Sequence, residues 1–486
     1  MTTRTAIDYS MHVAGAWVES ESGARIEATS PATGEAIGTV PEGTREDARR
    51  AIAGANAAAR EWAARSAFER AAAMERVAAI IEERRDDLAR TLTLDQGKPL
   101  QAESYAEVDE LVEYWRMAAG DARRLEGLMP PSVDARKRVL AYRVPRGVVG
   151  VITPWNWPYT MAAEVVAPAL ASGNTVVWTP ASSTAVCSVK LAQCVVDAEL
   201  PAGVFNFVTG PGPVVGDEIA GNAGTHAIGF VGSIATGLRV AERAAGKAVL
   251  LEMGGNGPLV VLDDADLDAA VEATLAAAFL CAGQSCTAGE RFLVHEDVHD
   301  EYLDKLTAAI SSEIRLGDPF AGETTMGPLN NEGTAAKMDS HVGDAVEGGA
   351  ALVVGGGRAN GFPTNLYYEA TVLDRVTDEM EVAREETFGP IVPITTIQSE
   401  DEALAIINSS PYGLLTGVFT RDLGRGLRFA EAARAGWVNV NESTNYWESH
   451  LPFGGRAGSQ SGIGRVGGRF SMETFTELKT VVVNLG

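Results

Sequence analysis

One cysteine of this chain lies in a setting suited to covalent catalysis. Cys286 stands in the segment GQSCTAGER, directly after an alanine-rich stretch, and Gly283 in that segment allows another part of the backbone to approach closely. A lone cysteine is more often a small buried hydrophobic residue than a nucleophile. Catalysis also requires a base or a lowered thiol pKa, and a donor that stabilises an oxyanion. Cys286 is therefore a candidate nucleophile if the fold supplies those partners.

A base and a donor are present elsewhere in the sequence. No histidine is close to Cys286 along the chain, but LEMGGNGP places Glu252 at the end of an expected strand, before two glycines. A carboxylate among apolar residues has a raised pKa, which suits proton abstraction near neutral pH. TPWNWP places Asn156 in a stiff loop between two tryptophans, where its amide could donate to an oxyanion. The alternative for this loop is a packed aromatic turn.

Two glycine-containing turns are candidates for binding a phosphate. TGPGPVVG (residues 209–216) follows the expected strand VFNFV, and FVGSIATG (residues 230–237) repeats the strand–turn–helix order one unit later. Glycines in such turns let backbone N–H groups reach a phosphate at the helix N-terminus. The first turn lacks both the G-x-G-x-x-G spacing and an acidic residue about 20 positions later. A dinucleotide site and ordinary tight turns therefore both remain open from these residues.

Alternating helices and strands are expected to position these residues. Residues 45–125 are rich in Ala, Glu and Arg at helical spacing, and MPPSVD (129–134) ends this helical region. Short apolar strands separated by helices then indicate parallel sheets in two successive α/β domains. The expected elements are the strands 147–152, 174–178, 204–210, 292–295 and 390–397, and the helices 162–171, 185–198, 267–282 and 299–314. KTVVVNLG (479–486) is an apolar terminal strand with no following partner, which favours pairing with another subunit.

Composition limits the class of protein. The 486 residues include 40 basic and 65 acidic side chains, a formal net charge of −25 that disfavours nucleic-acid and membrane-surface binding. The sequence has no C-x-x-C pair, no H-E-x-x-H and no Cys/His cluster, so neither a disulfide framework nor a metal site is expected. The first residues, MTTRTAIDYSMHVAG, lack the apolar region of a signal peptide, and no apolar run reaches the roughly 18 residues of a membrane span. We therefore expect a cytoplasmic protein.

Seven motifs, in order, resemble those of the NAD(P)-dependent aldehyde dehydrogenase superfamily. They are TPWNWP, SGNTVVWTPASS, FVGSIATG, LEMGGNGP, GQSCTAGER, EETFGP and PFGG…SGIGR, and together they span nearly the whole chain. The resemblance implies an α/β fold with two doubly wound parallel-sheet domains, one Rossmann-like for the cofactor and one catalytic, plus a small β element for oligomerisation. It implies a cofactor domain of residues 1–124 and 146–253, a catalytic domain of residues 254–452, and oligomerisation strands in 125–145 and 470–486.

The resemblance also implies a mechanism and a set of site residues. Cys286 attacks the aldehyde, Asn156 and the Cys286 N–H stabilise the oxyanion, a hydride passes to NAD or NADP, and Glu252 activates the water that releases the acid. Glu386 would hold the nicotinamide ribose, Phe388 would lie beside the nicotinamide, and a homodimer or homotetramer is implied. The other implied cofactor residues are Thr153, Pro154, Trp155, Thr179, Ser182, Gly212, Gly216, Phe230, Gly232, Ser233, Met253 and Gly254. The implied substrate-pocket residues are Trp157, Met161, Glu164, Ser285, Thr287, Tyr446, Trp447 and Phe453.

Three departures from the family pattern affect specificity. The usual K-P-x-E after the GNTVV strand is here Thr179-Pro180-Ala181-Ser182, which removes both the cation and the carboxylate and leaves NAD against NADP open. Five residues, 456–460, separate PFGG from SG where the family usually has three. Glu164 stands where semialdehyde dehydrogenases for anionic substrates often carry Arg. Unless a local arginine pairs with Glu164, neutral, aromatic or cationic aldehydes should be oxidised better than succinic semialdehyde.

Two further functions are compatible with the same residues. A CoA-acylating or esterase-like activity would use the same Cys286 thiolate, and a non-catalytic structural protein could share the fold. The acylating branch of the family typically lacks the glutamate, so Glu252 favours hydrolysis to a free acid. Cys286, Glu252 and Asn156 together favour an enzyme over a structural protein.

Overall fold

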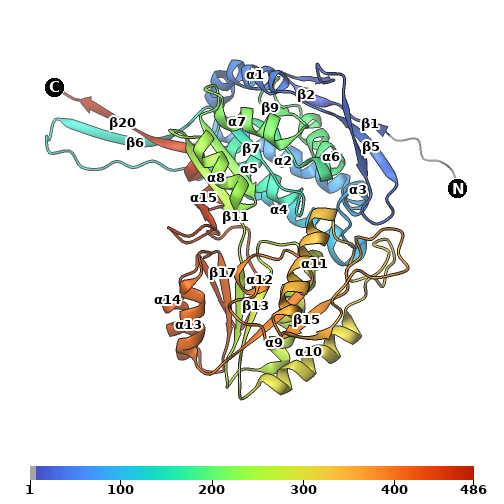
Figure 1. Cartoon of the computed structure of the whole chain (residues 1–486). Helices are drawn as coiled ribbons and strands as arrows, with labels where there is room; N and C mark the ends of the chain where they lie inside the picture. The colour runs from blue at the N-terminus through green and yellow to red at the C-terminus, as the bar shows by residue number, and fades with distance from the viewer. Residues whose placement is uncertain (1–6) are drawn as a thin grey trace.

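The computed structural model of the chain describes residues 7–486, so the first six residues of the predicted first domain lie outside the described part. Two α/β bodies lie one above the other, and a narrow two-stranded arm extends sideways from the upper body (Figure 1). The predicted fold class, two doubly wound α/β units with a small β element, is confirmed. No helix within residues 7–486 has the length and apolar character needed to cross a membrane.

The predicted helical region at residues 45–125 folds into four α-helices. Thr44 and Ser66 each cap the start of a helix through a capping box. The hydroxyl accepts a hydrogen bond from the backbone N–H three residues later, and the carboxylate of that later residue accepts one from the backbone N–H of the capping residue. The helices are α1 (Arg45–Ala64), α2 (Ala67–Glu83), α3 (Arg85–Gln96) and, after the short π-helix η1 (Leu100–Ser104), α4 (Tyr105–Ala122).

The upper sheet is mainly parallel. Its strands are β2 (Met11–Val13), β3 (Ala16–Val18), β7 (Val148–Ile152), β8 (Thr175–Thr179), β9 (Phe205–Phe207), β10 (Ala227–Gly232), β11 (Ala248–Met253) and β19 (Gly462–Ile463). The strand order is β19-β11-β10-β7-β8-β9-β2-β3, and the five strands from β11 to β9 in this order run parallel. A separate three-stranded sheet of β1 (Ile7–Asp8), β5 (Ala36–Pro41) and β4 (Arg25–Thr29) lies near the N-terminus.

Helices cover both faces of the upper sheet. Alternate residues of β7 point to opposite faces: Val148 packs with α1, and Val149 packs with the helices of the other face. One face carries α1, α7 (Asp217–Gly221) and α8 (Ile234–Arg243); the other carries α2, α4, α5 (Thr160–Ala171) and α6 (Ala185–Asp197). Two short helical turns, η2 (Ser182–Thr184) and η3 (Gly212–Gly216), lie in the connections.

The lower sheet repeats this layered arrangement. Its strands are β12 (Gly257–Val261), β13 (Gly289–His295), β14 (Ala351–Val354), β15 (Thr371–Asp374), β16 (Ile391–Ile397), β17 (Leu415–Phe419) and β18 (Trp437–Val440), in the order β14-β15-β16-β13-β12-β17-β18. Only the β14–β15 pair among them is antiparallel. One face carries α9 (Leu267–Phe279), α10 (His299–Glu313) and α11 (Glu332–Glu347); the other carries α13 (Glu400–Ser409) and α14 (Leu423–Ala432). The short helices η4 (Leu280–Gly283) and α12 (Glu381–Arg384) precede β13 and β16.

The arm joins two segments that are far apart in the chain. β6 (Lys137–Pro145) pairs antiparallel with β20 (Thr476–Asn484), from Thr476 opposite Pro145 to Asn484 opposite Lys137. The C-terminal strand, expected to lack a partner, is therefore paired within its own chain. It begins at Thr476 because residues Arg469–Phe475 form a helix, α15, that packs on α5.

Candidate active site

The upper sheet has a crevice where its strand order reverses. From β7 the chain moves outward to β8 and β9, and then returns to place β10 on the other side of β7. Connections leave such a point toward opposite faces, so a crevice opens at the carboxyl ends of the two strands. The segment from Thr153 to Asn156 follows β7, Gly232 ends β10 and Ser233 follows it, and Glu252 is near the end of β11. The fold thus brings three of the predicted motifs to one edge of the sheet.

The loop after α9 is held tightly against a second loop. The helix ends at Phe279, before the predicted end at Ala282, because Cys281 and Ala282 take positive φ values of 55° and 52°. Gly283 also has a positive φ, and a Cβ atom at this position would lie 2.0 Å from the carbonyl oxygen of Gly389. The expected close approach at Gly283 is therefore made to the EETFGP segment.

Asn156 is fixed beside the loop that carries Cys286. Its side chain is 5% exposed, and its Nδ2 donates to the carbonyl oxygen of Gln284 at 3.0 Å. Because an amide NH2 group has two N–H donors, one remains for a group near Cys286. The arrangement is suited to stabilising an oxyanion.

Glu252 is a buried carboxyl group without a hydrogen-bond partner. Neither of its oxygens has a partner among residues 7–486. Burial raises the pKa of Glu252 well above its usual value, the negative charge of Glu164 adds to this, and Arg465 opposes it. A carboxyl group with these properties is a stronger base than an exposed glutamate.

The same surroundings keep Cys286 protonated. Burial raises the pKa of the Cys286 thiol, and the negative charges of Glu252, Glu386 and Glu164 raise it further. Since the thiolate is the reactive form, attack by Cys286 requires removal of its proton by a base. Glu252 is a suitable base, because it and Cys286 line the same cavities.

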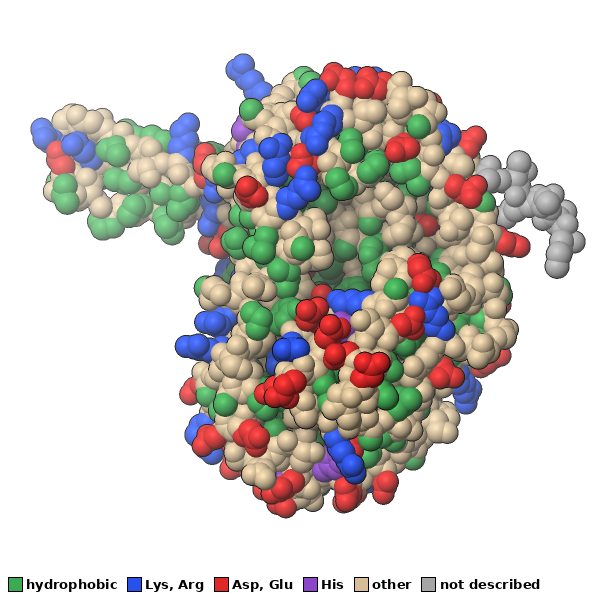
Figure 2. Space-filling view, in the orientation of Figure 1, with side chains coloured by type: hydrophobic (Ala, Val, Ile, Leu, Met, Phe, Trp, Pro, Cys, Tyr) green, Lys and Arg blue, Asp and Glu red, His purple; other side chains and the backbone are tan. Residues whose placement is uncertain are grey.

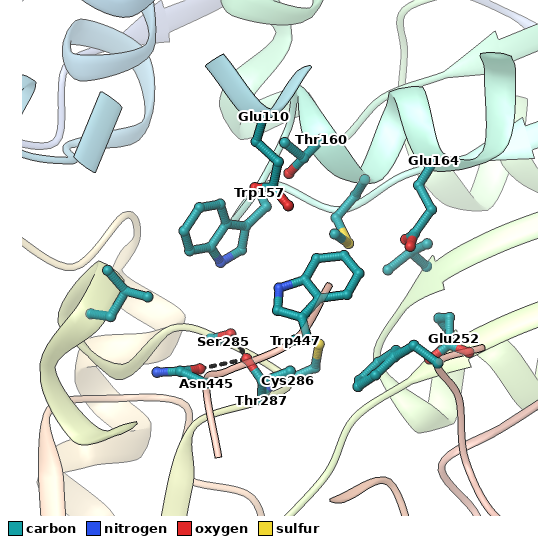
Figure 3. A pocket seen from close by; sticks show the side chains of 14 residues that line it. Glu110, Trp157, Thr160, Glu164, Glu252, Ser285, Cys286, Thr287, Asn445 and Trp447 are labelled. Carbon is teal, nitrogen blue, oxygen red and sulfur yellow. Dashed lines mark hydrogen bonds between the residues drawn. The ribbon is translucent and has the colours of Figure 1, made fainter. Parts of the chain in front are cut away.

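The first cavity at Cys286 has a volume of about 560 Å³ and contains most of the predicted substrate residues. Figure 3 shows Cys286 on the opposite side of this cavity from Glu110 and Glu164. The predicted residues that line it are Trp157, Met161, Glu164, Ser285, Thr287, Trp447 and Phe453. The lining residues that the sequence did not indicate are Glu110, Thr160, Val231, Leu280 and Asn445.

Tyr446 does not line the cavity. Its side chain is 48% exposed, and its hydroxyl donates to Glu448 at 2.8 Å. The neighbouring residues Asn445 and Trp447 do line it, so the chain direction at this turn sends Tyr446 outward.

A second cavity, of about 910 Å³, adjoins the first. Cys286, Glu252, Met161 and Val231 line both cavities. The predicted cofactor residues in the second cavity are Pro154, Trp155, Gly232, Ser233, Met253, Gly254, Glu386 and Phe388, together with Asn156. Its unpredicted lining residues are Asn331, Gly333, Thr334, Lys337 and Thr387.

Two predicted cofactor residues lie behind this second cavity. Thr153 accepts a hydrogen bond from the Trp178 indole at 2.8 Å, and Phe230 packs in the core under α8. Both are almost fully buried and support the wall of the cavity from behind.

The second cavity has the features that a dinucleotide requires. Ser233 caps α8 through the Thr236 N–H, and the other N–H groups of the first turn have no acceptor within the helix, which favours a phosphate there. One oxygen of Glu386 accepts from the Gly255 N–H at 3.0 Å, which leaves the other oxygen for a ribose hydroxyl. A Cβ atom at Gly254 would lie 2.5 Å from that second oxygen, so glycine keeps the carboxylate accessible.

A third cavity lies between η3 and α8 and is suited to the adenosine end. Gly212 and Gly216 line it, together with Arg239 and Arg243. Thr179 and Ser182 do not line it; Thr179 is buried, and the Ser182 hydroxyl donates to the Gly210 carbonyl oxygen at 3.3 Å.

Comparison with known proteins agrees with these features. The model of the aldehyde dehydrogenase family matches residues 17–481. The chain belongs to the aldehyde dehydrogenase family. It is 39% identical to 3-sulfolactaldehyde dehydrogenase of Pseudomonas putida over 96% of this chain and 95% of that protein. It is 38% identical to an NADP(+) succinate-semialdehyde dehydrogenase of Escherichia coli, over 97% of each. The crystal structure of succinate-semialdehyde dehydrogenase from Burkholderia pseudomallei matches with a TM-score of 0.95 and 38% identity, covering 100% of this chain and 99% of that one.

The protein is therefore an NAD(P)-dependent oxidoreductase that converts an aldehyde to a carboxylic acid. Within this dehydrogenase, the EETFGP segment is held in a strained conformation at the second cavity. Phe388 has a φ of 63°, which is unfavourable for a non-glycine residue. Its ring packs edge-on against the Trp155 ring, with the two ring centres 5.6 Å apart. Glu290 accepts the N–H groups of Thr387 and Phe388 at 2.5 and 2.7 Å, which fixes this conformation.

A buried ion pair supports the Asn156 loop of the dehydrogenase from behind. Lys98 and Glu107 are fully buried and 2.6 Å apart, and the Lys98 ammonium lies 3.1 Å from the centre of the Trp157 ring. Glu107 also accepts from the Tyr159 N–H at 3.0 Å, at the start of α5. The pair therefore links α4 to the loop that follows Asn156.

Proposed function

We propose that the dehydrogenase forms free carboxylic acids through a covalent intermediate on Cys286, with Glu252 as general base and Asn156 as oxyanion donor. The observation that supports this most directly is that Cys286 and Glu252 line both the first cavity, here called the substrate cavity, and the second, here called the cofactor cavity. An aldehyde carbon bonded to Cys286 would lie at the junction of the two. A base at the same junction can act on the thiol first and on water afterwards.

The first step forms a bond between the Cys286 Sγ and the aldehyde carbon. The thiol proton passes to Glu252, and the carbonyl oxygen becomes an oxyanion that the Asn156 amide stabilises. When bound, NAD(P)+ supplies the acceptor for the hydride that leaves the resulting thiohemiacetal carbon. Glu386 and Phe388, with the N-terminus of α8, are the residues suited to holding that cofactor.

The second step releases the acid. Once the proton taken from the thiol has passed from Glu252 to solvent, Glu252 takes a proton from water, the water oxygen attacks the thioester carbon, and the acid is released as the bond to Sγ breaks. The buried position of Glu252 and its raised pKa support this role. A CoA-acylating enzyme would not need a base at this position, so Glu252 favours the hydrolytic reaction.

A panel of aldehydes with NAD+ and NADP+ supplied separately tests the proposal. We expect reduced cofactor and free acid to form in equal amounts, measured by ultraviolet absorbance and by product analysis. Absence of reduced cofactor with every aldehyde, from a folded protein that binds NAD(P)+, would contradict the proposal. A thioester product that forms only when CoA is added would instead support the acylating alternative.

The cytoplasm is the proposed location of the dehydrogenase. Cys187, Cys194, Cys281 and Cys286 are all free thiols. A nucleophilic thiol stays reduced most readily in a reducing compartment, where disulfides are rare.

We further propose that the arm formed by β6 and β20 makes the dehydrogenase a homo-oligomer, either a dimer or a tetramer. Figure 2 shows hydrophobic side chains along the arm. Leu478, Val482 and Leu485 on β20 and just after it are 55%, 57% and 59% exposed. Apolar side chains on an edge that projects into solvent favour burial by a second copy.

Deleting Thr480–Gly486 should shift the particle mass by light scattering toward smaller species or aggregates, with loss of activity. Val482→Asp should produce the smaller species without shortening the chain. Leu423→Asp is a matched control, because Leu423 is 65% exposed on α14, away from the arm. If the mass and activity of the deletion variant equal those of the wild type, the arm does not mediate assembly.

A further inference from the structure

Two carboxyl groups of the substrate cavity have no role in the proposed mechanism. Glu110, Glu164 and Glu252 all line this cavity, and no lysine, arginine or histidine lines it with them. Glu252 has a role as the base. Glu110 and Glu164 therefore place two ionisable carboxyl groups in a mainly apolar space, and the proposed chemistry gives no reason for them.

Glu110 and Glu164 come from two neighbouring helices and point into the cavity. Glu110 is on α4 and Glu164 is on α5, which pack against each other. In Figure 3 both side chains extend into the cavity from the side opposite Cys286. A substrate whose carbonyl carbon reaches Cys286 would therefore present its other end to these two carboxyl groups.

Neither carboxyl group is neutralised by the protein. Among residues 7–486, Glu110 makes no hydrogen bond or ion pair, and Glu164 accepts only one long hydrogen bond, from the Tyr114 hydroxyl at 3.5 Å. The alternative that a local arginine forms an ion pair with Glu164 is therefore not met among residues 7–486. Thr160, the first residue of α5, also lines the cavity, and its hydroxyl has no partner among the described residues.

A buried cation on the Trp157 ring is already paired. Lys98 lies on the Trp157 ring, but its charge is taken by Glu107 at 2.6 Å, and Lys98 does not line the cavity. Three aromatic rings also line the cavity, those of Trp157, Trp447 and Phe453, and the ring centres of the last two are 5.5 Å apart. Aromatic faces and unpaired carboxylates both attract a positively charged ligand.

We propose that the dehydrogenase acts on aldehydes that carry a protonated primary amino group at the end of a short chain, with the ammonium held between Glu110 and Glu164. This inference rests on the proposed function, because it assumes that the carbonyl carbon is at Cys286. A primary ammonium has three N–H donors, and the two carboxyl groups and the Thr160 hydroxyl provide three acceptors. An anionic semialdehyde would meet like charges without a compensating cation.

The binding of an ammonium should depend on pH. Burial raises the pKa of Glu164 to about 8, and Glu110 adds to this shift. Burial also raises the pKa of Glu110 to about 7, with a further contribution from Glu107. As pH falls, Glu164 becomes protonated around pH 8 and Glu110 around pH 7, and each then loses its attraction for a cation. The other titratable groups that act on this pair are Tyr114, Glu252, Cys286 and, near Trp157, the ion pair of Lys98 and Glu107.

The test compares two aldehydes of nearly equal shape, one with a charged group and one with an uncharged apolar group at the end far from the carbonyl. 3-Aminopropanal and butanal differ only by an ammonium in place of a methyl group. We expect kcat/KM for 3-aminopropanal to exceed that for butanal by about 10- to 100-fold at pH 8, the value of charge-assisted hydrogen bonds. Succinic semialdehyde should be the poorest of the three. The ratio of 3-aminopropanal to butanal should fall as the pH is lowered from 8 to 6.

Variants assign the effect to the two carboxyl groups. Glu110→Gln and Glu164→Gln should each reduce the ratio of 3-aminopropanal to butanal by roughly 10-fold. Glu113→Gln is a matched control, because Glu113 is on α4 but faces solvent, and it should leave the ratio unchanged.

The inference fails if butanal or succinic semialdehyde equals or exceeds 3-aminopropanal in the wild-type enzyme. It also fails if betaine aldehyde, whose quaternary nitrogen has no N–H donor, is preferred to 3-aminopropanal. In either case, oxidation of butanal that depends on Cys286 would leave the proposed function intact. Absence of oxidation of every aldehyde would instead contradict the proposed function itself.

Discussion

Cys286→Ser should lower the rate of NAD(P)H formation by at least about 1,000-fold. A serine hydroxyl is a far weaker nucleophile than a thiol at neutral pH, and the carboxylates around position 286 oppose ionisation of either group. Binding of NAD(P)+ should be nearly unchanged, because the cofactor cavity has many other lining residues. Stopped-flow absorbance measures the first effect, and calorimetric titration with cofactor measures the second.

The buried thiol at Cys281 supplies the control for this experiment. It lies in the loop that leads to Cys286, but it lines neither the substrate nor the cofactor cavity. Cys281→Ser should therefore keep turnover within a few-fold of the wild type. Appreciable turnover by Cys286→Ser, or loss of turnover only in Cys281→Ser, would remove Cys286 from its assigned role.

Glu252→Gln should abolish the rapid burst of NAD(P)H and reduce turnover about 100- to 10,000-fold. Glutamine is similar in size but can accept neither the thiol proton of Cys286 nor the proton of the hydrolytic water. Intact-protein mass spectrometry during turnover should therefore show no acyl group on Cys286. The residual rate is read from the steady-state slope.

The size of the burst separates two roles of Glu252. If Glu252 serves only the hydrolytic step, one burst of NAD(P)H per active site remains and the acyl group accumulates on the protein. Steady-state turnover equal to that of the wild type would exclude Glu252 as the base. The raised pKa values of Glu252 and Cys286 make either deprotonation chemically demanding, so the measurement is informative in both directions.

The sequence indicates the parts of this enzyme that depend on local chemistry. Continuous apolar strands followed by glycine-containing turns indicate parallel sheets. The residues that follow β7 and β10 then meet at the carboxyl ends of these strands. The order of the motifs is sufficient for the family, which the comparisons confirm. Which residues act within the site remains a prediction, although Cys286, Glu252 and Asn156 lie together.

Other features depend on contacts between distant segments and cannot be predicted from local patterns. Glu110 belongs to a helix that was expected, but its inward direction depends on how α4 packs against α5. The end of α9 at Phe279 depends on positive φ values at Cys281 and Ala282, which ordinary helical residues do not signal. Tyr446 lies between two cavity residues and differs from them only in the direction of its side chain.

The pairing of β6 with β20 has a consequence for the synthesis of the protein. Arg143 of β6 donates to the carbonyl oxygen of Glu473, 330 residues later in the chain. A contact of this sequence separation forms late, because β20 is synthesised more than 330 residues after β6. The arm is therefore complete only after β20 has been made. A nascent chain that has not reached β20 lacks this surface, so the proposed assembly through the arm would exclude it.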